Sequence, residues 1–121
     1  MDASGNFYAV SKSFLIEHPS PEKKANGVKL RHASLEGPEH GVYVRGSLRD
    51  QNTIILPDYW KDLVDEDTIT VSLTAKKYAQ PNLFVEEVNS ERIIINSDKP
   101  INCDYVVYGE RKDIDKLEVE A

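Results

Sequence analysis

The side chains that could perform chemistry in this sequence are three histidines, two closely spaced glutamates, a serine and a single cysteine. His32 and His40 lie in the stretch LRHASLEGPEHGVYVRGSL, residues 30–48, and His18 precedes a proline. Histidine and glutamate can together hold a metal, but the spacing here fits none of the usual zinc patterns, such as HExxH or CxxC pairs. We therefore interpret the histidines as structural and expect no metal and no other cofactor.

A hydrolytic site would need an activated serine or a suitable pair of carboxylates. Ser34 follows His32 by two residues, but HASLEG is not the GxSxG elbow that presents a nucleophile. The members of a triad need only meet in space, so the sequence leaves a triad open without supporting one. Glu36 and Glu39 flank a Gly-Pro turn, and glycosidase chemistry would require one of them in an apolar pocket that raises its pKa. We therefore expect that the chain is not an enzyme. The Ser34 hydroxyl is expected to cap the turn between the two neighbouring strands.

Four side chains are better candidates for binding a receptor or partner: Tyr78, Tyr43, Arg45 and His40. Tyr78 lies in the polar loop KKYAQ and is expected to be exposed. The aromatic residues together could form a sugar-stacking surface. Aromatic residues make up 8% of the chain, which is an ordinary aromatic content for a β-sheet core, so core packing is the leading interpretation.

Composition limits the classes of partner. The chain has 121 residues, of which 40% are hydrophobic and 30% charged, which fits one soluble globular domain. The net charge of -6 would repel a phosphate backbone, so we expect no nucleic acid. No apolar run is long enough for membrane insertion, and the N-terminus has neither the basic nor the apolar region of a secretory signal.

The single cysteine, Cys103, cannot form an internal disulfide, which fits folding in a reducing compartment. It alternates with Ile101 and Tyr105 in a strand-like pattern. We therefore interpret Cys103 as a buried thiol that acts as a small apolar side chain.

Alternation of apolar and polar residues predicts a series of short strands. The expected strands cover residues 7–16, 28–32, 42–48, 53–56, 68–74, 83–88, 92–95 and 101–108. Two hairpins are expected, one joining 42–48 to 53–56 and one joining 83–88 to 92–95. Gly109 is expected to end the last strand, and residues 22–27 to form a charged loop.

One short helix is expected over residues 57–64, because Pro57 suits a first helical position. Tyr59 and Leu63, like Trp60 and Val64, are spaced four apart and would stack on one face. A helix this short needs tertiary support, so we expect Trp60 or Tyr59 to plug an open end of the sheet.

These elements predict an all-β fold, an antiparallel β-sandwich or barrel of about eight short strands with one short helix. Residues 12–113 would form the β module. Residues 1–11 would be a flexible or extended segment and 114–121 a charged tail. The tail beginning at Glu110 alternates in charge, and is interpreted either as a solvated end or as a strap for oligomerisation.

Five blocks of the sequence resemble a module found in virion proteins of tailed phages, especially tail-fibre-like proteins of T4-like phages of marine cyanobacteria. The blocks appear in the same order in the module and are KSFLIEHP at residues 12–19, SLEGPEHGVYVRG at 34–46, IILPDYW at 54–60, DEDTITVSLT at 65–74 and VVYGERKD at 106–113.

This resemblance implies a non-enzymatic building block of a virion appendage, such as a tail fibre or spike. It implies a homo-oligomer, with a trimer favoured, that contacts other virion proteins and is assembled in the host cytoplasm. The alternative function is a module that binds a host-surface glycan or receptor. The resemblance supplies no catalytic residues, and it leaves open whether the chain is an excised module or a small complete protein.

Overall fold

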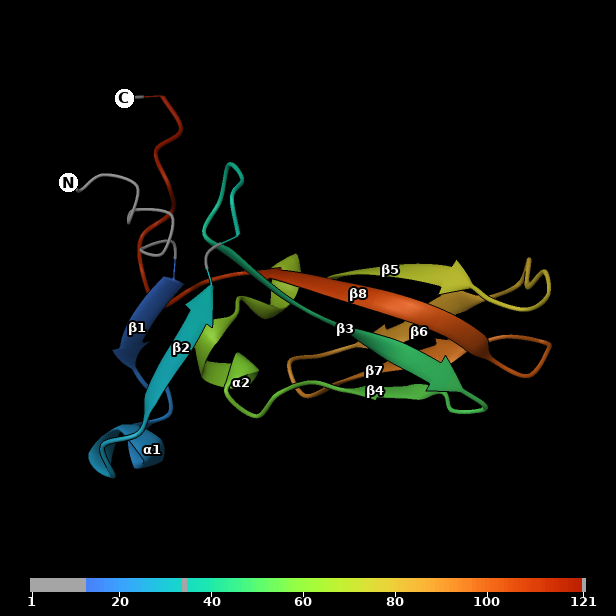
Figure 1. Cartoon of the computed structure of the whole chain (residues 1–121), viewed down its shortest axis with the longest axis horizontal. Coiled ribbons are helices and arrows are strands. Elements are labelled where there is room, and N and C mark those ends of the chain that lie inside the picture. The colour runs from blue at the N-terminus through green and yellow to red at the C-terminus, as the bar shows by residue number, and fades with distance from the viewer. Residues whose placement is uncertain (1–12, 34, 121) are drawn as a thin grey trace.

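The structure is a computed structural model, and it describes residues 13–33 and 35–120. The elements follow in chain order (Figure 1). The first half contains β1 (Ser13–Glu17), α1 (Pro21–Ala25), β2 (Lys29–Ala33), β3 (Gly41–Arg49), β4 (Thr53–Ile55) and α2 (Trp60–Leu63). The second half contains a 3-10 turn (Glu66–Thr68), β5 (Thr70–Ala75), β6 (Phe84–Val88), β7 (Arg92–Asn96) and β8 (Asn102–Glu110).

Two three-stranded antiparallel sheets form the body of the protein. Their strand orders are β3-β8-β5 and β4-β7-β6, and β1 pairs with β2 in a separate two-stranded ribbon. The sheets form an elongated sandwich, with the ribbon and α1 at one end (Figure 1). The prediction of an all-β antiparallel sandwich is confirmed.

The core lies between the two sheets, where the alternating side chains of each strand meet. β8 contributes Cys103 and Val107, and β7 contributes Ile93 and Ile95, all with no exposed surface. The alternating pattern predicts inward positions for Cys103 and Val107 on β8, and both are confirmed. Burying an aliphatic side chain of this size contributes about 1.5–3 kcal/mol, so this pattern accounts for much of the stability.

The helix α2 closes the sandwich at the ribbon end (Figure 1). Trp60, Leu63 and Val64 are completely buried there. The predicted helix is confirmed in place but is shorter than expected. It begins at Trp60 because the Trp60 N–H closes a turn on the carbonyl of Pro57, at 3.0 Å, so Pro57 precedes the helix. Of the two aromatic residues proposed as a plug, Trp60 is the one that fills this role.

The charged loop expected at residues 22–27 is wrong, because Pro21–Ala25 form the helix α1. Pro21 occupies the start of the helix, where its missing N–H costs no hydrogen bond. Gly27 has φ of 77°, a left-handed conformation that ends the helix and lets the Val28 N–H bond to the Lys23 carbonyl at 2.9 Å.

The hairpin expected between residues 42–48 and 53–56 is also wrong. β3 pairs with β8, whereas β4 pairs with β7 in the opposite sheet. The intervening turn bonds to those two partners instead. The Asp50 N–H donates to the Ile101 carbonyl and the Ile95 N–H donates to the Asn52 carbonyl, both at 2.8 Å. The turn therefore carries the chain from one sheet to the other.

The hairpin expected between residues 83–88 and 92–95 is confirmed as β6 and β7. Its turn is held by the Asn89 side chain, whose Oδ1 accepts from the Glu91 and Arg92 N–H groups at 2.8 Å.

Gly109 does not end the last strand. It is buried inside β8, opposite Val42. A β-carbon on Gly109 would come within 2.4 Å of the Val64 Cγ1 atom. Glycine is therefore needed here because the α2 region packs directly on the strand.

Candidate functional site

Two of the three histidines pack against one tyrosine. The rings of His18 and His32 contact Tyr59 edge-on, with centroids 6.0 and 5.5 Å away, and His32 Nε2 lies 3.1 Å from the Tyr59 hydroxyl oxygen. His18 is buried, and its Nδ1 accepts the Ser20 N–H at 3.1 Å. Burial, followed by the charge of Arg111, lowers the pKa of His32. This cluster joins the ribbon to α2, which is a structural role.

The turn before β3 holds the other residues considered for catalysis. Glu36 and Glu39 are exposed to solvent, so neither lies in the apolar pocket that an acid catalyst requires. His40 is half-buried, and its carbonyl accepts the Arg111 N–H at 2.8 Å. Ser34, with its expected cap, lies outside the described residues. Within residues 13–33 and 35–120, no three histidine, cysteine, aspartate or glutamate residues gather to hold a metal ion.

Cys103 is a free thiol with no exposed surface, as predicted. Burial raises the pKa of this thiol; the charge of Arg49 has a smaller lowering effect, and the charge of Asp104 a smaller raising one. A protonated, buried thiol is a poor nucleophile. Cys103 therefore contributes packing to the core.

Tyr43 and Arg45 lie together on the outer face of the β3-β8-β5 sheet. Tyr43 pairs across the strands with Tyr108, and their ring centroids are 6.3 Å apart at an angle of 42°. Both rings are largely open, with 47% and 40% of their surface exposed. Arg45 is opposite Val106, in the next outward row. Tyr43 and Arg45 thus share a surface with Tyr108, one of the aromatic residues considered for a sugar-stacking surface.

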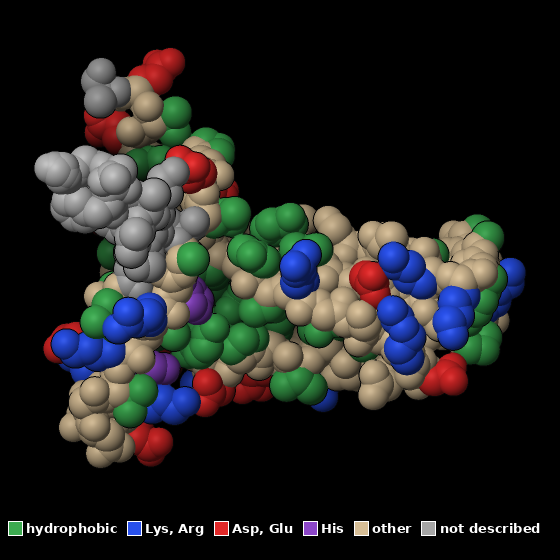
Figure 2. Space-filling model, in the orientation of Figure 1, with side chains coloured by type: hydrophobic (Ala, Val, Ile, Leu, Met, Phe, Trp, Pro, Cys, Tyr) green, Lys and Arg blue, Asp and Glu red, His purple; other side chains and the backbone are tan. Residues whose placement is uncertain are grey.

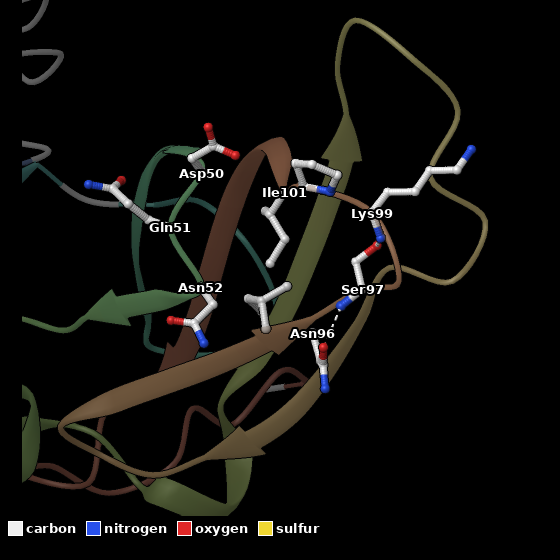
Figure 3. A pocket seen from close by; sticks show the side chains of 9 residues that line it. Asp50, Gln51, Asn52, Asn96, Ser97, Lys99 and Ile101 are labelled. Carbon is white, nitrogen blue, oxygen red and sulfur yellow. Dashed lines mark hydrogen bonds between the residues drawn. The ribbon is translucent and has the colours of Figure 1, made fainter.

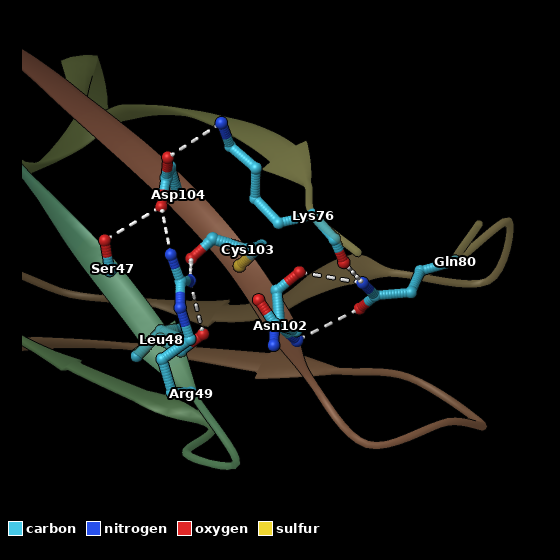
Figure 4. A network of polar contacts seen from close by, with 8 residues as sticks. All are labelled: Ser47, Leu48, Arg49, Lys76, Gln80, Asn102, Cys103 and Asp104. Atoms are coloured by element: carbon cyan, nitrogen blue, oxygen red, sulfur yellow. Dashed lines mark hydrogen bonds and ion pairs between the residues drawn. The ribbon is translucent and has the colours of Figure 1, made fainter. Parts of the chain in front are cut away.

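A polar network fills the far end of this outer face (Figure 4). Asp104 is at its centre: its Oδ1 accepts from Ser47 at 2.8 Å and from Arg49 at 2.9 Å, and Lys76 is 3.4 Å from its Oδ2. Hydrogen bonds from Ser47 and Arg49 are the largest effects that lower the pKa of Asp104, to about 2. This carboxylate stays ionised and paired, and cannot serve as an acid catalyst near neutral pH. Gln80 is buried in the same network. Its side-chain amide donates to the Asn102 carbonyl at 2.7 Å and accepts the Asn102 N–H at 3.2 Å.

Tyr78 is exposed, as predicted, but lies apart from the other three candidates. It belongs to the β5–β6 loop at the sandwich end far from the ribbon, and its hydroxyl donates to the Pro100 carbonyl. Figure 2 shows basic side chains gathered near this end. The four predicted binding residues therefore do not form one site.

Shallow hollows lie around these surfaces. One of about 400 Å³ runs between the ribbon and β3, lined by His32, Leu35, Tyr43 and Arg45 among others. One of about 340 Å³ lies on the other side of Arg45. A third, of about 330 Å³, is at the end of the sandwich between Asp50 and Ser97 (Figure 3). Asn96, one of its polar side chains, binds its own loop, because its Oδ1 accepts the Ser97 N–H at 2.7 Å.

The outer face of the second sheet is different, because apolar side chains cross it diagonally. Ile55 on β4 is 73% exposed and Phe84 on β6 is 50% exposed, with Ile94 on β7 between them. The registers place both as diagonal neighbours of Ile94, about 7–8 Å away between strands. We call these three residues the apolar stripe. Arg92 and Glu87 flank it, 3.9 Å apart.

The aromatic residues considered for a sugar-stacking surface include Tyr108 and Phe84, but sequence reasoning favoured core packing for them and did not identify the apolar stripe. Outward parity in β8 was visible for Tyr108, opposite to that of Cys103. Its proximity to Tyr43, however, depends on the pairing of β3 with β8, two strands that are far apart in the chain. The stripe likewise depends on the β4–β7 pairing, which the sequence did not predict.

Comparisons of the chain with protein-family models, with curated proteins and with solved structures found no match. Among the described residues, the structure has no helix with the length and apolar character needed to span a membrane.

Proposed function

We propose that the chain is a structural module of a phage virion appendage, and that it works by associating with copies of itself and not by catalysis. The resemblance of its five sequence blocks to virion modules supports the setting, which is a tail fibre or spike, and contact with other virion proteins. It also favours a trimer. The apolar stripe is the single observation that carries the proposal of self-association.

A stripe of this kind is costly to leave in water. Each fully covered aliphatic or aromatic side chain contributes about 1.5–3 kcal/mol, so covering Ile55 and Phe84 is a substantial driving force. Contiguous exposed apolar side chains rimmed by polar residues commonly mark protein contacts. Ile55 and Phe84 fit this description, with 73% and 50% of their surfaces exposed.

A second copy of the chain is the occupant that the flanking charges favour. Arg92 and Glu87 lie beside the stripe, so the patch carries both signs and can meet another copy of itself with opposite charges facing. Three copies of such a stripe can also meet around a threefold axis, each contacting the next.

Substitution of the stripe tests this proposal. Ile55→Glu combined with Phe84→Ser should convert the oligomer to a monomer in sedimentation velocity, because both side chains are exposed and their loss leaves the core intact. Tyr78→Ser is the matched control, an exposed aromatic on a loop, and should leave the oligomer unchanged. An oligomer that survives the double substitution would contradict the stripe as the contact.

A second candidate function, binding of a host-surface glycan, is favoured by the paired Tyr43 and Tyr108 rings on the opposite outer face. Tyrosine supplies a rigid, amphipathic contact surface at low entropic cost, and is common in binding surfaces for that reason. This face remains open when the apolar stripe is covered, so the two functions are compatible. Loss of saccharide binding on Tyr43→Ala, measured by glycan array, would support it; binding unchanged in that variant would exclude this face.

A further inference from the structure

We propose that the outer face of the β3-β8-β5 sheet binds an acidic saccharide, with Tyr43 and Tyr108 stacking on sugar rings and Arg45 pairing with a carboxylate. The inference rests on the second candidate function above. It adds the charge of the ligand and the residue that recognises it.

Arg45 is exposed, and it makes no hydrogen bond or ion pair within the part of the chain that the structure describes. Arg49, on the same strand, is fully engaged by comparison. Its guanidinium donates to the Leu48 and Cys103 carbonyls at 3.0 and 2.8 Å and to Asp104 at 2.9 Å. The side chain of Arg45 instead lies between the two hollows of about 400 and 340 Å³ and lines both. A free guanidinium offers a planar pair of donors that matches a carboxylate.

The charges around Arg45 favour an anion. Asp104, the nearest outward carboxylate on β8, is already bound by Ser47 and Arg49 and has Lys76 beside it. Glu110, at the other end of the same face, pairs with Lys116 at 2.7 Å. Neither carboxylate therefore lacks a cation, and the charge of Arg45 remains uncompensated on this face of an otherwise acidic protein.

The remaining groups on this face suit a sugar. Arg45 is two positions from Tyr43 on β3, about 7 Å along the strand, so a ligand on the tyrosine rings can reach the guanidinium. β5 adds outward hydroxyls beside them, since Thr70 pairs with Tyr108 and Ser72 with Val106. Both hydroxyl residues are exposed. Hydroxyl donors and acceptors adapt to the hydroxyls of a sugar, and the tyrosine rings provide the stacking surface.

A nucleic acid fits this face less well than an acidic saccharide. Single-stranded nucleic acids also stack on aromatic residues, but they bring one phosphate for every base and need a continuous basic groove. Among residues 13–33 and 35–120, Arg45 is the cation on this face for which no carboxylate partner is seen, and the chain has a net charge of -6. A saccharide with spaced carboxylates needs only one such cation per contact.

The test is calorimetric titration of the full chain with oligogalacturonate and with the same oligosaccharide after reduction of its carboxyl groups. Arg45→Gln should weaken binding of the acidic form about tenfold, as expected for loss of a charge-assisted hydrogen-bonded pair, and leave the reduced form unchanged. Tyr43→Ala should weaken both forms. The controls Arg31→Gln, a matched change on the ribbon, and Tyr78→Ala should alter neither.

Each other outcome has a definite meaning. If wild type and Arg45→Gln bound the acidic and the reduced oligosaccharide with equal affinity, the role of Arg45 would be overturned, but saccharide binding by this face would still be supported. Unchanged binding in Tyr43→Ala, or no binding of either form, would overturn the second candidate function as well. Polyglutamate binding as tight as that of oligogalacturonate would also overturn the inference, because charge alone would then suffice. Light scattering on the same samples reports self-association separately.

Discussion

Gly109 lies under the side chains of Val64 and Trp60, and a β-carbon added there would come 2.4 Å from one and 3.3 Å from the other. Val64 is fully buried and cannot move aside cheaply. Gly109→Ala should therefore lower the free energy of unfolding by about 2 kcal/mol, the usual cost of overpacking a core. Urea denaturation would measure it. Gly37→Ala is the control, because no atom lies within 4 Å of the added carbon, and it should change stability little.

His32 makes stability depend on pH. Burial and Arg111 lower its pKa in the folded protein below the ordinary value of 6.5. The unfolded chain then binds more protons at mildly acidic pH, so stability is complete above about pH 6.5 and falls as pH drops through that value. Unfolding midpoints between pH 7.5 and 5.5 should show this decline. His32→Gln should flatten it, and a full slope in that variant would assign the decline to other groups.

At the level of elements, Trp60 is the largest of the buried side chains that anchor α2. Trp60 is completely buried, and its Nε1–H finds no hydrogen-bond partner among the described residues. Trp60→Ala should cost about 3–5 kcal/mol, a large part of the stability of a small domain. Thermal unfolding would measure the loss.

Trp60→Phe is the informative companion. It removes the unpaired N–H, whose burial costs about 1–3 kcal/mol, and so offsets part of the lost packing. The Phe variant should therefore lie close to wild type in melting temperature. A loss equal to that of Trp60→Ala would show that the indole shape is indispensable.

The sequence predicted strands well wherever one face is buried. Alternation identified the inward residues of β8 because period two follows directly from strand geometry. The prediction failed where strand pairing is long-range. A polar turn such as that at Asp50 permits either a hairpin or a crossing between sheets, and the choice depends on how all the strands pack in the core. Gly109 was misread because glycine signals a break in isolation, whereas here it makes room for Val64.

The candidate surfaces were less predictable than the fold. The common outward face of Tyr43 and Arg45 follows from the predicted strand over residues 42–48, because the two residues are two positions apart. Tyr78, the aromatic residue expected to be exposed, is exposed but lies in a loop at the end of the sandwich far from the ribbon. Residue type and exposure can be inferred locally, but the grouping of side chains from different strands requires the register.

At the scale of the whole molecule, the two outer faces divide the proposed roles. One carries the apolar stripe of Ile55, Ile94 and Phe84, and the other carries the tyrosine pair with Arg45. Covering the stripe would turn the tyrosine faces outward, which suits an appendage that displays several copies of one binding surface. Repeated display raises avidity without any new contact.

Self-association is the claim on which the proposed role depends, and the mass of the wild-type particle tests it most directly. Light scattering coupled to size exclusion at micromolar concentration should give an integral multiple of the chain mass, and we predict three. A single chain mass under those conditions would contradict the account.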